Sequence, residues 1–257
     1  MFQRFKHTKL YYYFLTRMIP SIRRAVRAEQ ALYQSLLSSF DPPFLVFDLG
    51  ANVGHSCQMF LNLGAKVICV EPEKKNLEIL HRRFGGNKSV QIVEEAIGNQ
   101  AGERVLFVQD TGTALHTIQE DWKSFLSSNA NDRWADPISF SSQQLVQTNT
   151  LRQLINRFGR PDFLKIDVEG NELEVLETLD QPIPLVCFEA NLPQFAEMTT
   201  GCIRRLASIS PTATFNYTDG KDLLSNTPMN AAQMEKLVER TPLRYMDICC
   251  WMPPSPQ

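Results

Sequence analysis

FLVFDLGANVG, residues 44–54, is the stretch that decides the fold of this chain. Its first four residues, Phe44–Phe47, are all apolar, as in a parallel strand that is buried on both faces. Asp48 ends the strand, and Gly50 and Gly54 frame a tight turn, because glycine lets the backbone bend sharply and approach a ligand closely. A helical pattern follows, so the stretch predicts a strand–loop–helix unit with a ligand at the carboxyl end of the strand.

The spacing of the glycines selects between ligands. A dinucleotide site uses G-x-G-x-x-G, whereas here Gly50 and Gly54 are too close together and Asn52 occupies the middle position. The phosphate-binding pattern G-x-x-x-x-G-K-[ST] is also absent. The remaining pattern, D-x-G-x-x-x-G, favours a ligand with an amino acid end. Asp48 and loop carbonyls could receive its ammonium, directly or through water, and the first amides of the helix could face its carboxylate.

Glu71-Pro72 gives a second signal at the end of the next expected strand, Lys66–Val70. A carboxylate at this place can accept both hydroxyls of an unphosphorylated ribose. Two acids beside the site, Asp48 and Glu71, also suit a cationic ligand.

Glu95 and Ala96 follow a third expected strand, Val90–Val93, where the adenine edge of a ligand would lie. The Glu95 carboxylate or the Ala96 backbone could pair with an adenine amino group. A solvated acidic pair, Glu94-Glu95, is the alternative interpretation.

Strand and helix patterns alternate along most of the chain. Two further strands are expected at Asp162–Ile166 and Leu185–Phe188, with helical periodicity between the strands. This order predicts an α/β fold, a doubly wound and mostly parallel sheet that binds ligands at the carboxyl ends of its strands. We expect residues 43–257 to form this domain, with a polar insertion or lid at about 109–143.

The charge is distributed unevenly. The 257 residues carry a net charge of −2, which argues against a nucleic-acid binder that depends on its overall charge. Residues 1–40, however, contain seven Lys or Arg and one acid. We expect residues 1–42 to form a basic helical extension, with a helix over Ser21–Ser39. A helical cap is the favoured role, and peripheral contact with an anionic membrane is the alternative.

The six cysteines contain no C-x-x-C pair. Cys69 and Cys187 interrupt apolar runs, where a thiol behaves as a small hydrophobe. A chain of this length needs no disulfide scaffold. We therefore expect free thiols and a reducing, cytoplasmic compartment.

LKIDVEGNE, residues 164–172, follows the fourth expected strand. Together with FDLGANVG at 47–54 and VEPEKKNLEIL at 70–80, it resembles the FkbM family of methyltransferases over roughly residues 44–190. The resemblance implies a Rossmann-like class I fold and S-adenosylmethionine as the methyl donor. It also implies that the acceptor is a hydroxyl on a small molecule, sugar or natural product. The chain departs from the family at Arg152-Gln153, where acids are usual, so no role of those acids carries over.

Transfer of a methyl group to a hydroxyl requires a base or a metal near the transfer line. Asp167 and Glu169 are the first candidates, either as base or together as oxygen ligands of a divalent cation, although no metal site is assigned. Asp167 would also border the cofactor. Glu189 ends the fifth strand and could position the acceptor, and His116 is a further candidate on the acceptor side.

Three other functions are compatible with parts of the sequence. The first is a cofactor-binding domain of the same fold without catalysis, since a fold alone does not prove activity. The second is a nicotinamide-dependent oxidoreductase, which the glycine spacing disfavours. The third is a nucleic-acid methyltransferase, permitted weakly by the basic N-terminus. The DPPF segment at 41–44 matches the amino-methyltransferase motif only superficially, because it precedes the first strand.

Overall fold

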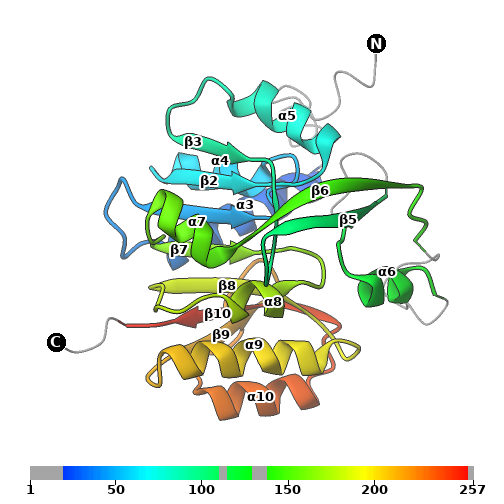
Figure 1. Cartoon of the computed structure of the whole chain (residues 1–257). Helices are drawn as coiled ribbons and strands as arrows, with labels where there is room; N and C mark the ends of the chain where they lie inside the picture. Colours follow the sequence, from blue (N-terminus) through cyan, green and yellow to red (C-terminus); the bar gives the residue numbers. More distant parts are fainter. Residues whose placement is uncertain (1–19, 110–114, 129–137, 254–257) are drawn as a thin grey trace.

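A computed structural model describes residues 20–109, 115–128 and 138–253 of the chain. Its main element is a seven-stranded sheet in the order β3-β2-β1-β7-β8-β10-β9 (Figure 1). The five strands from β3 to β8 run parallel, and β10 is antiparallel to both of its neighbours. The strands are β1 Leu45–Leu49, β2 Lys66–Val70, β3 Val90–Val93, β7 Phe163–Ile166, β8 Leu185–Asn191, β9 Thr214–Thr218 and β10 Tyr245–Trp251.

This order confirms the doubly wound, mostly parallel sheet. After β1 the chain moves outward to β2 and β3, and it then returns to β7 on the other side of β1. The carboxyl ends of β1 and β7 therefore form the topological switch point, where open α/β sheets bind their ligands.

Helices cover both faces of the sheet (Figure 1). One core packs under α3 (Pro20–Leu36), α4 (His55–Asn62) and α5 (Lys74–Phe84). The other packs under α7 (Leu151–Phe158), α8 (Glu172–Glu177), α9 (Ala196–Ile209) and α10 (Ala231–Arg240). The two-residue period of a strand assigns Val46 to the first core and Phe47 to the second.

The helix α3 is part of the domain and not an appendage to it. Its side chains Leu32, Tyr33 and Leu36 are buried in one core with Phe60 and Phe163. The Tyr33 and Phe60 ring centroids are 4.8 Å apart. The chain segments before and after the expected boundary at residue 42 therefore share one hydrophobic core. Residues 1–19, which carry four of the basic residues of the predicted extension, lie outside the described residues.

A second, three-stranded sheet has the order β4-β6-β5, formed by β4 (Ala96–Gly98), β5 (Gly102–Val108) and β6 (Ser142–Thr150). The sequence analysis missed β4, β6 and α10. The described part of the expected lid contains α6 (Glu120–Leu126) and the start of β6. The buried ring of Trp122 fixes α6 to the loop after β7, because it lies against Gly170 and Phe195.

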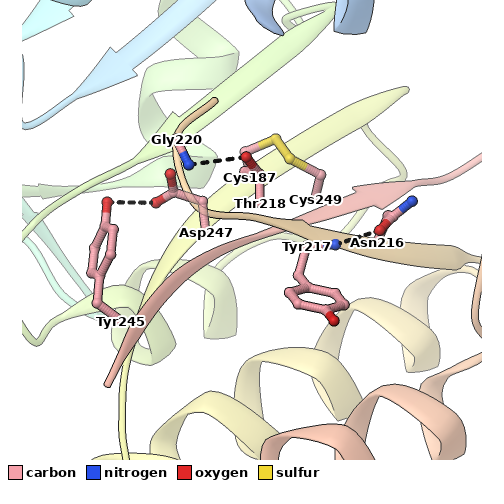
Figure 2. Close-up of a disulfide and its surroundings, with 8 residues drawn as sticks. All are labelled: Cys187, Asn216, Tyr217, Thr218, Gly220, Tyr245, Asp247 and Cys249. Atoms are coloured by element: carbon pink, nitrogen blue, oxygen red, sulfur yellow. Dashed lines mark hydrogen bonds between the residues drawn. A yellow bond between two sulfur atoms is a disulfide. The ribbon is translucent and has the colours of Figure 1, made fainter. Parts of the chain in front are cut away.

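The expectation of six free thiols is wrong. Cys187 on β8 and Cys249 on β10 are register partners and form a disulfide (Figure 2). Sequence spacing could not show this pair, because 62 positions separate the two cysteines and the antiparallel return of β10 brings them together. The remaining described cysteines are free and buried. The cysteine argument for a reducing compartment therefore no longer holds.

Within the three described segments, no helix combines the length and the apolar character needed to cross a bilayer.

Candidate active site

A cavity of about 610 Å³, its open side included, lies at the switch point between β1 and β7. Nine residues selected from the sequence line it: Gly50, Asn52, Glu71, Pro72, Glu95, Ala96, His116, Asp167 and Glu169. The residues come from five separate segments, which only the fold brings together. We call this the cofactor cavity.

Gly50 allows two loops to approach each other at the floor of the cofactor cavity. Its φ of 81° lies in the left-handed region, and a Cβ there would be 1.7 Å from the backbone oxygen of Asp167. No side chain fits in that space. Glycine is therefore required at this position by the packing of the β1 and β7 ends, in addition to any ligand.

Gly54 and Asp48 do not line the cavity. A Cβ on Gly54 would lie 2.4 Å from the ring of Phe84, so this glycine permits the packing of α5 against the turn. Asp48 is fully buried, and neither carboxylate oxygen has a hydrogen-bond partner of good geometry in the described chain. Burial raises the pKa of Asp48 to about 6, against the lowering effect of Lys165.

A buried acid with unsatisfied oxygens beside a cavity fits a cationic ligand, because an opposite charge or a bridging water would compensate it. Asp48 does not line the cavity, so it would interact with such a ligand through a bridging water.

Glu71 lines the cavity at the position expected for a ribose ligand, but it is already bound by the protein. Its Oε2 accepts the N–H of Asn52 at 2.8 Å, and its Oε1 accepts the N–H of Glu73 at 3.0 Å and the amide of Asn76 at 3.4 Å. A carboxylate offers about four acceptor positions, so roughly one is left for a ligand hydroxyl. Burial raises the pKa of Glu71 to about 7, and the two backbone donors oppose this.

Glu95 has protein partners as well. Its Oε2 accepts the side-chain amide of Asn149 at 3.0 Å, and its Oε1 lies 3.6 Å from a guanidinium nitrogen of Arg157. Glu94 forms an exposed pair with His81. The alternative of a solvated acidic pair therefore fits Glu94 but not Glu95. Both oxygens of the Glu95 carboxylate therefore already have protein partners.

Three carboxylates meet at the edge of the cofactor cavity, and two of them, Asp167 and Glu169, line it. One oxygen each from Asp167, Glu169 and Glu189 lie within 4.8 Å of one another. Asp167 also accepts Lys165 Nζ at 2.7 Å, and Glu189 accepts the side-chain amide of Asn191 at 2.8 Å. The ends of β7 and β8 supply this cluster. Its chemistry suits proton transfer, and its hard oxygen ligands would also suit a divalent cation.

His116 lines the cofactor cavity, where the sequence analysis expected it on the acceptor side. Its Nδ1 accepts the N–H of Gln109 at 3.2 Å. In the neutral ring the proton is then on Nε2, so His116 presents a donor and is poorly suited to act as the base.

Glu172 is hydrogen-bonded to the loop that carries two members of the carboxylate cluster, Asp167 and Glu169. Its Oε1 accepts the N–H groups of Val168 and Gly170, at 3.2 and 3.3 Å, and the side chain is fully buried. The amides that it binds belong to the loop before α8. It therefore positions the loop that carries Asp167 and Glu169. Hydrophobic periodicity gives no signal for such a role.

The sequence was also compared with known proteins. The family model described as "Methyltransferase FkbM domain" matches residues 48–207, which is more than half of the chain. No curated protein matches the sequence.

Three of the solved structures to which the chain is similar are methyltransferases. A precorrin-6y C5,15-methyltransferase from Geobacter metallireducens is 10% identical with a TM-score of 0.44, covering 91% of this chain and 87% of that one. A TehB-like S-adenosylmethionine-dependent methyltransferase from Corynebacterium glutamicum is also 10% identical with a TM-score of 0.44, covering 88% of each chain. The plantazolicin methyltransferase BpumL, solved with S-adenosylhomocysteine, is 10% identical with a TM-score of 0.42, covering 93% of each.

The family match begins at the acid that ends β1 and includes every strand end that forms the cofactor cavity. The chain belongs to the FkbM family of methyltransferases.

Proposed function

We propose that this methyltransferase acts on oxygen and transfers the methyl group of S-adenosylmethionine to a hydroxyl of a small molecule, sugar or natural product. S-adenosylmethionine is the cofactor, in agreement with the family. The choice of oxygen rests on one observation, the three carboxylate oxygens of Asp167, Glu169 and Glu189 within 4.8 Å. A hydroxyl acceptor must lose its proton during transfer, and a carboxylate cluster provides a place for it.

The cofactor cavity has the groups that the adenosyl amino acid needs. Glu71 accepts a ribose hydroxyl, and the backbone at Ala96 meets the adenine edge. Asn52 and Gly50 bring the β1 turn close to the amino acid end, and the buried charge of Asp48 favours a cation nearby.

The sulfonium supplies an activated methyl group, so the protein has to align the acceptor, exclude water and receive one proton. The carbon–sulfur bond breaks with its electron pair going to sulfur, and a carbon–oxygen bond forms to the acceptor. Asp167 is held in an ion pair with Lys165, and we assign the role of base to Glu169. Glu169 takes the hydroxyl proton and releases it to solvent.

Two measurements test this proposal. The first is titration calorimetry with S-adenosylhomocysteine, which should bind to the wild type and to Glu169→Gln with similar affinity. The second is methyl transfer from labelled S-adenosylmethionine, which Glu169→Gln should slow by about 100-fold or more, since general bases contribute on that order. Glu177→Gln, an exposed acid on α8, is the matched control and should keep wild-type turnover.

Treatment with a chelator distinguishes the two possible roles of the carboxylate cluster, proton transfer and binding of a divalent cation. With Glu169 as base, activity persists after incubation with EDTA. Activity that disappears with EDTA and returns with Mg²⁺ or Mn²⁺ would show that the cluster holds a cation. Methylation of amines in preference to hydroxyls would contradict the oxygen assignment.

A further inference from the structure

The backbone of Glu169 has a conformation that few residues adopt. Its φ of 53° lies in the left-handed region, which is unfavourable for any residue with a Cβ. Such a conformation persists only where surrounding contacts hold it, and it is common at active sites. The angle φ sets the direction of the Cα–Cβ bond relative to the preceding peptide group. The left-handed conformation of Glu169 therefore decides where its carboxylate points.

The peptide group between Glu169 and Gly170 is held at both of its polar ends. The hydroxyl of Thr117 donates to the carbonyl oxygen of Glu169 at 2.7 Å, and this contact is buried. The N–H of Gly170 donates to Glu172 Oε1 at 3.3 Å, and the same oxygen accepts the N–H of Val168 at 3.2 Å. Glu172 thus binds the amides on either side of Glu169, and Thr117 binds the carbonyl of Glu169 itself.

Thr117 is fixed by its own backbone. Its N–H donates to the carbonyl oxygen of Phe107 on β5 at 3.2 Å, and its carbonyl oxygen accepts the N–H of Phe107 at 2.8 Å. Its hydroxyl oxygen also accepts the N–H of Gln119 at 2.9 Å, so the one hydroxyl proton is directed to Glu169. Thr117 is 1% exposed, so water has little access to the bond.

The segment that carries Thr117 also borders the cofactor cavity. The two neighbours of Thr117 in the sequence, His116 and Ile118, line this cavity. Glu169 lines it too, from the loop after β7. The hydrogen bond from Thr117 to Glu169 therefore joins two segments of the cavity lining that lie far apart in the sequence.

We propose that Thr117 is a positioning residue for methyl transfer. Its hydroxyl holds the left-handed backbone of Glu169 and so keeps the Glu169 carboxylate beside those of Asp167 and Glu189, where it receives the proton of the acceptor. This inference rests on the proposed function and adds to it the residue that places the base. Thr117 touches no reacting atom, so its effect on the rate passes through Glu169.

The first test compares Thr117→Val with Thr117→Ser. Valine has nearly the shape of threonine but no hydroxyl, whereas serine keeps the hydroxyl. The assay is methyl transfer from tritiated S-adenosylmethionine to methyl α-glucopyranoside, methyl α-rhamnopyranoside or catechol. Thr117→Val should lower kcat by about 10-fold or more, since a small displacement of a catalytic group has effects of this order. The KM for S-adenosylmethionine should not change, and Thr117→Ser should restore most of the rate.

A double variant shows whether Thr117 acts through Glu169. In the Glu169→Gln background, Thr117→Val should slow turnover no further, because the base is already absent. A hydroxyl with a merely structural role would instead lower the rate by the same factor in both backgrounds. Thr199→Val is the matched control. It removes another buried hydroxyl, which donates to the carbonyl oxygen of Phe195 at 3.0 Å, and it should keep wild-type turnover.

Crystal structures with S-adenosylhomocysteine test the inference without an acceptor. In Thr117→Val, Glu169 should leave the left-handed region and its carboxylate should move away from those of Asp167 and Glu189. Thr117→Ser should keep the wild-type arrangement. If valine prevents folding, Thr117→Ala carries the same expectations, because it also lacks the hydroxyl.

Three results would overturn the inference: an unmoved Glu169 in Thr117→Val, wild-type turnover in Thr117→Val, or equal losses of rate in the two backgrounds. Failure of the proposed function would look different. Glu169→Gln would then turn over at the wild-type rate, whichever residue is present at position 117.

Discussion

Lys165 on β7 and Asp167, the residue that follows this strand, form an ion pair, with Nζ 2.7 Å from Oδ2. Lys165 is buried, and burial would by itself lower its pKa. Asp167, Asp48 and Tyr33 together reverse that effect, so the pKa of Lys165 is raised well above its usual value. The positive charge of Lys165 thus compensates several acids beside the cofactor cavity, Asp167 and Asp48 among them.

Replacement of Lys165 by Met should therefore destabilise the fold. The acids around it would lose their shared cation, and we expect a loss of about 1–3 kcal/mol of unfolding free energy, because Asp167 keeps some solvent contact. Urea unfolding measures the change. Arg204→Met, which breaks the surface pair of α9 with Glu235, serves as control and should cost less than about 1 kcal/mol. Equal losses in the two variants would contradict a special role for Lys165.

The second prediction concerns Glu71. Glu71→Ala should weaken binding of S-adenosylhomocysteine by about 1–3 kcal/mol, roughly 10- to 100-fold, because a ribose hydroxyl loses a charged acceptor. The same change frees the amides of Asn52 and Glu73, so the turn should also become less stable. Calorimetry and thermal unfolding measure the two effects. Glu78→Ala, at an exposed position on the following helix α5, should change neither, and unaltered affinity in Glu71→Ala would remove Glu71 from the cofactor site.

The third prediction concerns pH. Burial raises the pKa of Glu172 to about 7 in the folded chain, from 4.5 for an ordinary glutamate. The folded state then binds more protons than the unfolded state between these values. Stability from this group is therefore complete below about pH 4.5 and is lost as the pH rises through about 7.

Glu172→Gln should flatten that part of the stability profile. The neutral amide keeps an oxygen for the N–H groups of Val168 and Gly170, and its nitrogen replaces Oε2, which has no partner among the described residues. Urea unfolding at pH 5, 6, 7 and 8 gives the slope for each protein. A variant whose slope equals that of the wild type would show that Glu172 does not titrate in this range.

The fourth prediction concerns the disulfide. Reduction should lower the unfolding free energy by about 2–4 kcal/mol, since the bond closes a long loop in the unfolded chain. The urea midpoint of the wild type should fall on addition of dithiothreitol, whereas the Cys187→Ala/Cys249→Ala variant should not respond. Intact mass after alkylation under denaturing conditions provides a direct check. Alkylation of all six cysteines without reductant would show that the bond is absent.

The cofactor cavity was largely predictable because its residues are local to strand ends. A parallel strand that is buried on both faces appears in the sequence as an apolar run. The residue after the run lies at the carboxyl end of the strand, where open α/β sheets bind their ligands. For this reason Gly50, Glu71, Ala96 and Asp167 could each be selected from their own segment. Asp48 and Gly54 belong to the same motif, but Asp48 is buried and interacts electrostatically with Lys165, and Gly54 packs against α5. A motif alone does not distinguish packing from ligand contact.

The sequence by itself determined the α/β fold, the family and the positions of the cofactor residues, because periodicity and turn chemistry act over a few neighbouring residues. Only the tertiary structure decided the partnership of Cys187 with Cys249, the burial of α3 and the convergence of Asp247 with Glu189. These depend on the antiparallel return of β10 and on the docking of a helix from the other end of the chain. Contacts between such distant segments are set by the packing of the whole domain, so no local pattern encodes them.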